Sequence, residues 1–295
     1  MMSVSSELIP VEVCKGINGL DKVVLREDRG WSAEVYLFGA HVTSWKNKHG
    51  EEVFFSSRKA TFEPPLRTHG GIRICFPQFE KHGSLHLHGF ARRRFWRLDP
   101  NPPPLPETSH TKAFVDLILK PSGQDLNIWP HSFEFRLRVT LAPGGDLILT
   151  SRVRNVNTDG KPFCFSFAYH LYFPAIGYVE VQIEGLETDY LDDLKNKESL
   201  TGDEESEDGE LYIYSGVHSE TAGEDQWKIQ HVLTMDGIPG PGSPWLKKSK
   251  GLVDVGKDET DLKLRVETAA VENPITLNPG MEWKGILELY PIPAA

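Results

Sequence analysis

The side chains best suited to chemistry are concentrated between His69 and Leu98, where the sequence reads HGGIRICFPQFEKHGSLHLHGFARRRFWRL. Arg73 and the run Arg92 to Arg94 supply fixed positive charge with planar, forked N–H donors, a geometry that suits phosphate. The pair Gly70-Gly71 and Gly89 would let the backbone come close to a ligand. The segment therefore predicts one wall of a site for an anionic small molecule.

Two histidines of this segment also have a spacing that metal sites use. His86 and His88 would share one face of an extended chain, and Glu80, His82 or His170 could complete a set of ligands. The simpler interpretation, in which these are polar loop residues bonded to the backbone, fits the sequence equally well. We therefore favour a site without a metal and keep the metal site as an alternative.

A third possibility is an acid and base pair on two separate strands. In FCFSFAYH (163–170) aromatic residues alternate with small ones, which puts His170 on the face away from the phenylalanines. In LKLRVE (262–267) the same alternation puts Glu267 on the charged face. Such a pair could act across a cleft. Solvated or structural roles would produce the same spacing, so the residues alone leave this pairing open.

All of these side chains require a β framework, because short runs with a period of two, separated by turn residues, dominate the chain. SFEFRLRVTL (132–141) and LILTSRV (147–153) flank the turn APGGD and predict a long hairpin. Further strands are predicted near 22–26, 31–37, 41–45, 52–55, 94–98, 114–119, 211–214 and 227–233. Without βαβ alternation, this pattern predicts an all-β, antiparallel sandwich with few short helices.

The chain is expected to form one domain over residues 1–295. A proline-rich stretch near 100–110 is interpreted as a surface loop, since strands of the same kind resume directly after it. Residues 188–210 are acidic and poor in apolar side chains, which predicts a second surface loop.

Composition excludes several classes of function. The formal charge of -10 argues against a nucleic acid or an anionic membrane as partner. Three scattered cysteines without a CxxC pair indicate neither a disulfide framework nor a thiolate zinc site. No leader and no membrane-spanning stretch is recognised, so we expect a cytoplasmic protein. Serine hydrolase, P-loop and dinucleotide-binding motifs are absent from the sequence.

Three segments, GGIRICFPQF (70–79), HGFARRRFW (88–96) and VETAAVENPITLNPGMEWKGILEL (266–289), resemble one known family. They are similar to the glucose-6-phosphate 1-epimerases, or hexose-6-phosphate mutarotases, particularly the plant apospory-associated protein C group of the aldose 1-epimerase superfamily. FSFAYHLYF (165–173) continues the match in the same order, so the resemblance covers nearly the whole chain. It implies a galactose mutarotase-like β-supersandwich, an isomerase, and a site without metal or cofactor in the concave face of a sheet.

By position, the catalytic histidine of the family matches His170, its catalytic glutamate matches Glu267, and the arginine of its HGFAR motif matches Arg92. The resemblance implies interconversion of the α and β anomers of D-glucose 6-phosphate through the open-chain aldehyde. Glu267 would take the proton of the C1 hydroxyl while His170 protonates the ring oxygen. His88 resembles the second histidine of the family, which could bond a sugar hydroxyl.

The departures from the family lie among the residues that would bind substrate: His69, Arg73, Leu87 and Ser243. His69 stands where the family has arginine, so Arg67 or Arg73 is expected to supply the charge for the phosphate. Asp208 falls near an aspartate of the family.

These departures motivate an alternative function, a catalytically impaired carbohydrate-phosphate binding or regulatory protein of the same fold. For either function we expect a monomer whose partner is a hexose 6-phosphate.

Overall fold

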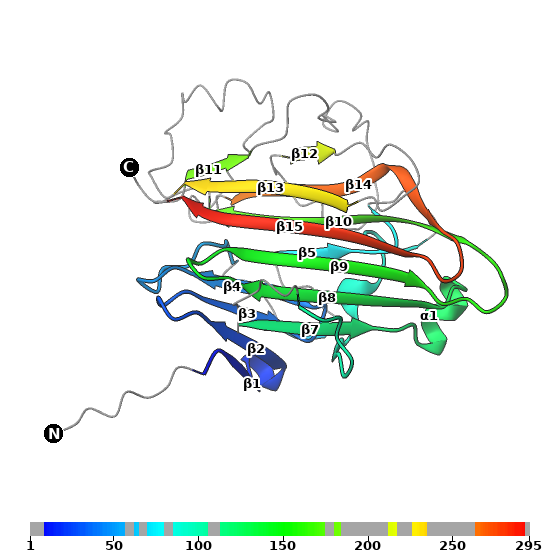
Figure 1. Ribbon diagram of the computed structural model, residues 1–295, viewed down its shortest axis with the longest axis horizontal. Coiled ribbons are helices and arrows are strands. Elements are labelled where there is room, and N and C mark those ends of the chain that lie inside the picture. The colour runs from blue at the N-terminus through cyan, green and yellow to red at the C-terminus, as the bar shows by residue number, and fades with distance from the viewer. Residues whose placement is uncertain are drawn as a thin grey trace.

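The computed structural model describes residues 9–56, 62–64, 70–79, 85–105, 113–173 and 274–291 with their side chains, and residue 292 by its backbone alone. It describes residues 174, 180–183, 212–216, 226–234 and 263–273 by their backbone. Within these residues the chain forms two sheets, one of eight strands and one of seven (Figure 1).

The first sheet holds the strands that position the candidate site. Its order is β1 (Val11–Lys15), β2 (Asp21–Arg26), β3 (Ser32–Tyr36), β4 (His41–Lys46), β5 (Ile72–Cys75), β10 (Phe163–Pro174), β14 (Lys263–Leu277) and β12 (Tyr212–Gly216). The short 3-10 helix η1 (Ile17–Gly19) connects β1 to β2.

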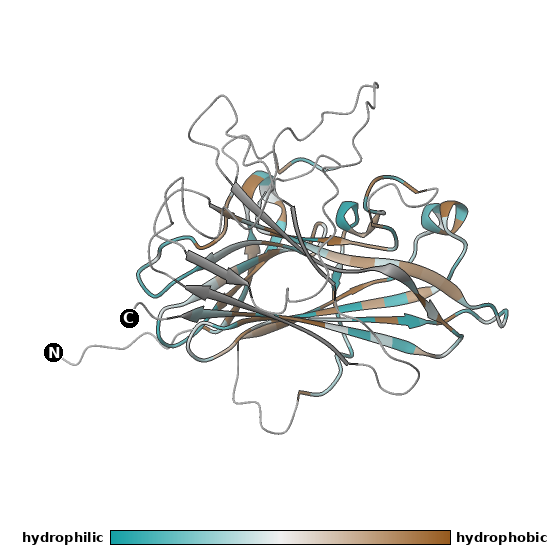
Figure 2. Cartoon of the chain, turned by 90° about the horizontal axis from the view of Figure 1, so that it is seen from above, coloured by the Kyte–Doolittle hydropathy of each residue, from teal (hydrophilic) through white to brown (hydrophobic). Residues whose placement is uncertain are grey.

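The second sheet packs against the first. Its order is β11 (Glu180–Ile183), β13 (Gln226–Thr234), β15 (Glu282–Ile292), β9 (Leu147–Asn155), β8 (Phe133–Leu141), β7 (Phe114–Leu119) and β6 (Arg97–Leu98). Helix α1 (Gly123–Ile128) precedes β8, and the 3-10 helix η2 (Ala91–Arg93) precedes β6. Hydrophobic and hydrophilic residues alternate along the strands that are coloured by hydropathy in Figure 2.

The core lies between the two sheets and follows from this alternation. Every second residue of β8, from Phe133 to Leu141, is buried in the same cluster as the aromatic residues at 163, 165, 167, 169 and 173 of β10. Two hydrogen bonds also join the layers. The hydroxyls of Ser151 in β9 and Tyr169 in β10 lie 2.6 Å apart, and the Trp45 indole in β4 donates to the Gly145 carbonyl at 3.0 Å.

The predicted all-β architecture is confirmed, with two exceptions to its antiparallel order. Strand β12 pairs with β14 and β13 pairs with β15 in parallel. The strand predicted at 52–55 is reduced to an isolated bridge between Lys46 and Glu52. The strand predicted at 94–98 covers only Arg97–Leu98, because η2 ends at Arg93 and Phe95 forms only an isolated bridge with Phe38.

Other predictions reach beyond the described residues. The acidic segment 188–210 lies outside them, and of the proline-rich stretch only residues up to 105 are included. Among the described residues, no helix is long and apolar enough to cross a membrane.

Candidate active site

The central strands of the first sheet bring three predicted site positions into one row. His170 of β10 is paired with Arg73 of β5 on one side and with Glu267 of β14 on the other. Directly opposed positions on antiparallel strands lie roughly 5 Å apart at Cβ. Two positions far apart in sequence, 170 and 267, are therefore neighbours in the sheet.

The side chain of His170 is enclosed on the face of β10 away from the core. It has no exposed surface, whereas its neighbours Tyr169 and Leu171 belong to the core cluster between the sheets. The His88 ring lies edge-on to the His170 ring, with centroids 4.4 Å apart. Phe79 packs on both rings, at 5.7 Å from His170 and 5.4 Å from His88. Bulk water is therefore kept from the imidazole of His170.

The segment that carries His88 is a turn and not an extended strand. The Gly89 amide donates to the His86 carbonyl at 2.8 Å, and His88 has a φ of 61°. His86 is exposed while His88 is buried. The prediction that His86 and His88 share one face is wrong, because that periodicity holds only for an extended chain.

The glycines of this region serve the packing of the chain on itself. A Cβ at Gly71 would collide with the Val42 carbonyl oxygen, and one at Gly89 would collide with the Phe76 carbonyl oxygen. Both residues also have positive φ angles, which side chains disfavour. The predicted role of these glycines in approaching a ligand is thus replaced by close contact between backbone segments.

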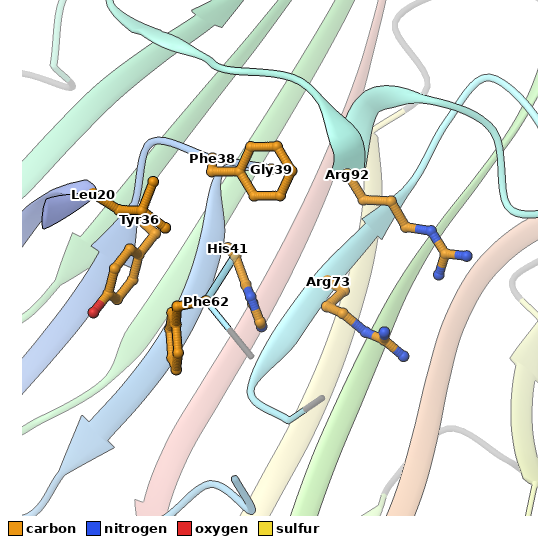
Figure 3. Close-up of a pocket in the computed structure, with 8 residues that line it drawn as sticks. All are labelled: Leu20, Tyr36, Phe38, Gly39, His41, Phe62, Arg73 and Arg92. Carbon is orange, nitrogen blue, oxygen red and sulfur yellow. The ribbon is translucent and has the colours of Figure 1, made fainter. Parts of the chain in front are cut away.

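Arg73 and Arg92 line one pocket, shown in Figure 3. Its other lining residues are Leu20, Tyr36, Phe38, Gly39, His41 and Phe62. Both guanidinium groups lie on the side of the pocket away from Tyr36 and Phe62 (Figure 3). Only 4% of Arg73 and 6% of Arg92 is exposed, so the pocket concentrates positive charge where water screens it little.

A side chain and a backbone carbonyl hold the two arginines in place. Arg73 donates to the Tyr172 hydroxyl, and its guanidinium lies 4.9 Å from the centre of the Tyr172 ring. Arg92 donates to the Leu87 carbonyl at 3.1 Å. Arg94 instead pairs with Asp125 of α1 at 2.6 Å. Consecutive arginines therefore diverge, and Arg92 is the member of the run 92–94 that reaches the pocket.

Several residues near this site were missed by sequence reasoning. His41 lines the pocket and its Nε2 donates to the Gly70 carbonyl at 2.7 Å. Tyr172 follows His170 by two residues, a spacing on one strand face that could have revealed it. Cys75 has no motif around it, yet its sulfur and nitrogens of His88 and His170 lie within 4.8 Å of one another.

Some predicted residues cannot be placed. Arg67, His69, Asp208, Ser243, Glu80 and His82 lie outside the described residues. At Glu267 the backbone register is described and the side chain is not.

Comparison with known proteins gives the family. The family model for aldose 1-epimerase matches residues 21–216. The chain belongs to the aldose 1-epimerase family. A Cenchrus ciliaris protein provisionally named glucose-6-phosphate 1-epimerase is 53% identical over 292 residues, which cover 96% of this chain and 88% of the relative. A Salmonella typhimurium protein with the same provisional name is 26% identical, over 68% of this chain and 65% of its own length.

A solved structure supports the fold. The galactose mutarotase related enzyme from Lactobacillus acidophilus superposes with a TM-score of 0.50 at 16% identity, covering 90% of this chain and 96% of that one. The galactose mutarotase-like fold expected from the sequence is thereby confirmed. As a member of an epimerase family, the protein is an isomerase.

Proposed function

We propose that the protein is a hexose-6-phosphate mutarotase that interconverts the α and β anomers of D-glucose 6-phosphate. The observation that carries this proposal is the row of positions 73, 170 and 267 across the sheet, next to a pocket lined by Arg73 and Arg92. The positions proposed for the acid and the base are thus neighbours in the sheet, and the position of Arg73, proposed for the anion site, is next to that of the acid. The similarity to relatives named glucose-6-phosphate 1-epimerase supports the same substrate.

In the ring-opening step the Glu267 carboxylate takes the proton of the C1 hydroxyl. The C1–O5 bond breaks as the C1 carbonyl forms, and protonated His170 gives its proton to O5. Since one proton leaves as another arrives, neither free hydroxide nor free acid is needed, and each group contributes roughly 10²- to 10⁴-fold.

Ring closure reverses these roles after rotation about the C1–C2 bond. His170 takes the proton of the O5 hydroxyl as O5 attacks the opposite face of the aldehyde, and Glu267 returns a proton to the C1 oxygen. The enclosure of His170 beneath Phe79 and His88 favours direct transfer between side chain and sugar.

Substrate binding is assigned to the arginine pocket and its surroundings. Arg92 and Arg73 would hold the phosphate through charge-assisted, forked hydrogen bonds, which would compensate for His69 in place of an arginine. Arg67 is a further candidate for the phosphate. His88 and Asp208 are candidates for bonds to sugar hydroxyls.

The cellular setting is part of the proposal. None of the three cysteines forms a disulfide, which supports a reducing compartment such as the cytoplasm. The excess of acidic residues supports a protein that binds neither nucleic acid nor membrane. The one hydrophobic cluster found among the described residues lies between the two sheets and supports one domain over residues 1–295, which we propose acts as a monomer.

Exchange between the anomers of glucose 6-phosphate, measured by NMR saturation transfer, tests the mechanism. His170→Ala and Glu267→Gln should each slow enzyme-catalysed exchange by roughly 10²- to 10⁴-fold with an unchanged circular dichroism spectrum. His49→Ala and Glu12→Gln, both at exposed positions, are the matched controls. Near-wild-type exchange in either site variant would refute the assignment. Binding of sugar phosphate without exchange in the wild type would favour the catalytically impaired binding protein.

A further inference from the structure

Three side chains beside the proposed acid form a compact group of nitrogen and sulfur donors. Cys75 ends β5, His88 lies in the turn before η2, and His170 lies in β10. All three are buried, and one donor atom from each lies within 4.8 Å of the other two. Cys75 is paired with Ala168, two residues before His170, so the thiol and the imidazole lie on one face of the sheet.

A thiolate with two imidazoles is a ligand set for borderline and soft metal ions. Ligands of a tetrahedral zinc ion lie roughly 3.3–3.8 Å from one another, given Zn–N and Zn–S bonds of about 2.0 and 2.3 Å. Small rotations of the three side chains would shorten the distances between their donor atoms, now within 4.8 Å, to that range. Mg²⁺ and Ca²⁺ prefer oxygen ligands and are not expected here.

We propose that Cys75, His88 and His170 form a binding site for Zn²⁺, and that zinc bound there inhibits the enzyme. The inhibition rests on the proposed function, because zinc would occupy the imidazole lone pair that the proposed acid must share with a proton. The binding itself does not rest on it. Proton transfer by His170 and coordination of zinc by His170 exclude one another.

Charges nearby set the strength of this site. Deprotonation of the Cys75 thiol supplies one negative charge to the metal. The guanidinium of Arg73, two residues from Cys75 on β5, opposes a cation. Three protein ligands leave a fourth position for water or an anion, the coordination found in catalytic zinc sites.

Cobalt(II) serves as the probe, because a thiolate bound to Co²⁺ gives a near-ultraviolet charge-transfer band and tetrahedral Co²⁺ absorbs strongly in the visible. The full chain, purified without a histidine tag, should bind one Co²⁺ with both features, and Zn²⁺ should displace it. Cys75→Ser should abolish the charge-transfer band and weaken binding at least tenfold.

The other two cysteines provide matched controls. Cys164→Ser removes an exposed thiol of β10, the strand that carries His170, and Cys14→Ser removes a half-buried thiol of β1, so both variants should keep the band. If serine at position 75 perturbs the fold, Cys75→Ala is the second variant, and circular dichroism checks that it is folded. Absence of a one-to-one complex in wild type, or a band that persists without Cys75, would overturn the site.

Activity gives an independent readout. Zn²⁺ should inhibit anomer exchange by the wild type and EDTA should restore it, whereas Cys75→Ser should need at least tenfold more Zn²⁺ for the same fractional inhibition of its own zinc-free rate. Equal sensitivity of both proteins would contradict inhibition through this site. A wild type that gives the cobalt spectrum but no anomer exchange would retain the metal site while refuting the proposed function.

Discussion

The guanidinium of Arg92 is separated from those of the two arginines that follow it by the geometry of one short turn. Arg92 is buried and lines the pocket, Arg93 is partly exposed, and Arg94 is directed to α1. Positive charge is therefore placed in the pocket by a single member of the run, so a substitution here has a specific effect.

Arg92→Ala should raise KM for glucose 6-phosphate with little change in kcat, because a charge-assisted bond to phosphate is worth enough for roughly a 10- to 100-fold change. Steady-state kinetics with glucose 6-phosphate and with free glucose would check this. Arg93→Ala removes the same charge from the adjacent position and is the control. An equal effect on both sugars would show that Arg92 does not bind the phosphate.

At this scale the sequence is informative where strand periodicity holds. The alternation in 163–170 correctly predicts that His170 points away from the core. The same period-two rule fails for His86 and His88, because a left-handed residue in a turn breaks the period. The nearness of Cys75 to His88 and His170 depends on the pairing of β5 with β10, and no local pattern encodes such long-range pairing.

Helix α1 acts as an anchor for the turn that carries Arg92. Ser122 and Asp125 form a capping box, in which the Asp125 amide donates to the Ser122 hydroxyl at 3.2 Å and the Ser122 amide donates to Asp125 at 2.9 Å. Arg94 donates to the other oxygen of Asp125. One buried carboxylate thus ties α1 to the end of η2.

Asp125→Asn should destabilise the fold at neutral pH by roughly 1–3 kcal/mol, since it removes the negative charge that accepts hydrogen bonds from Arg94 and from the capping residue Ser122. Burial acts to raise the pKa of Asp125, but hydrogen bonds from Arg94 and Ser122 outweigh it and hold the pKa below its ordinary value. The stabilisation is therefore present above the unfolded pKa of about 3.9 and is lost as pH falls through the lower folded pKa.

Urea unfolding of both proteins at several pH values is the measurement. The difference between them should shrink as the pH falls below about 4, where the unfolded chain begins to hold the proton. Asp28→Asn, at an exposed position, is the control. A difference that stays constant with pH would rule out the charge of Asp125 as its cause.

Elements with a clear alternation were predicted within a residue or two, as for β7, β8 and β9. Strand β5 is not predicted as a strand but as part of a ligand-binding wall, because its four residues beside two glycines are too few to show the alternation of a strand. The pair Ser122 and Asp125 at a spacing of three was a signal that could have revealed α1. The parallel pairing of β12 with β14 and of β13 with β15 joins strands that are distant in sequence, and the period of a strand does not specify its partner.

The molecule as a whole depends on how its two sheets are held in register. The hydroxyls of Tyr169 and Ser151 bridge the sheets in a fully buried position. Burial raises the pKa of Tyr169 far above its ordinary value, so this hydroxyl keeps its proton throughout the physiological range.

Tyr169→Phe should cost roughly 1–3 kcal/mol of unfolding free energy, because the Ser151 hydroxyl would remain buried without a bond. Ser151→Ala should also destabilise, and the double variant should be less destabilised than the sum of the two single ones. Chemical denaturation of all four proteins gives this coupling directly. Additive effects would mean that the bond between the sheets contributes nothing.

The general architecture was predictable because period-two patterns and a family resemblance lead to the same fold. The assembly of the site was not predictable from residue patterns alone, since it depends on which strands become neighbours in the first sheet.

The row that joins positions 73, 170 and 267 has a consequence for how the protein is made. Roughly a hundred residues of chain separate each position from the next, so two long loops must close before the row exists. A chain emerging from the ribosome holds the proposed acid long before the proposed base, and it stays inert until β14 has been synthesised and inserted beside β10. On the proposed mechanism, catalytic competence therefore requires that β14 has paired with β10.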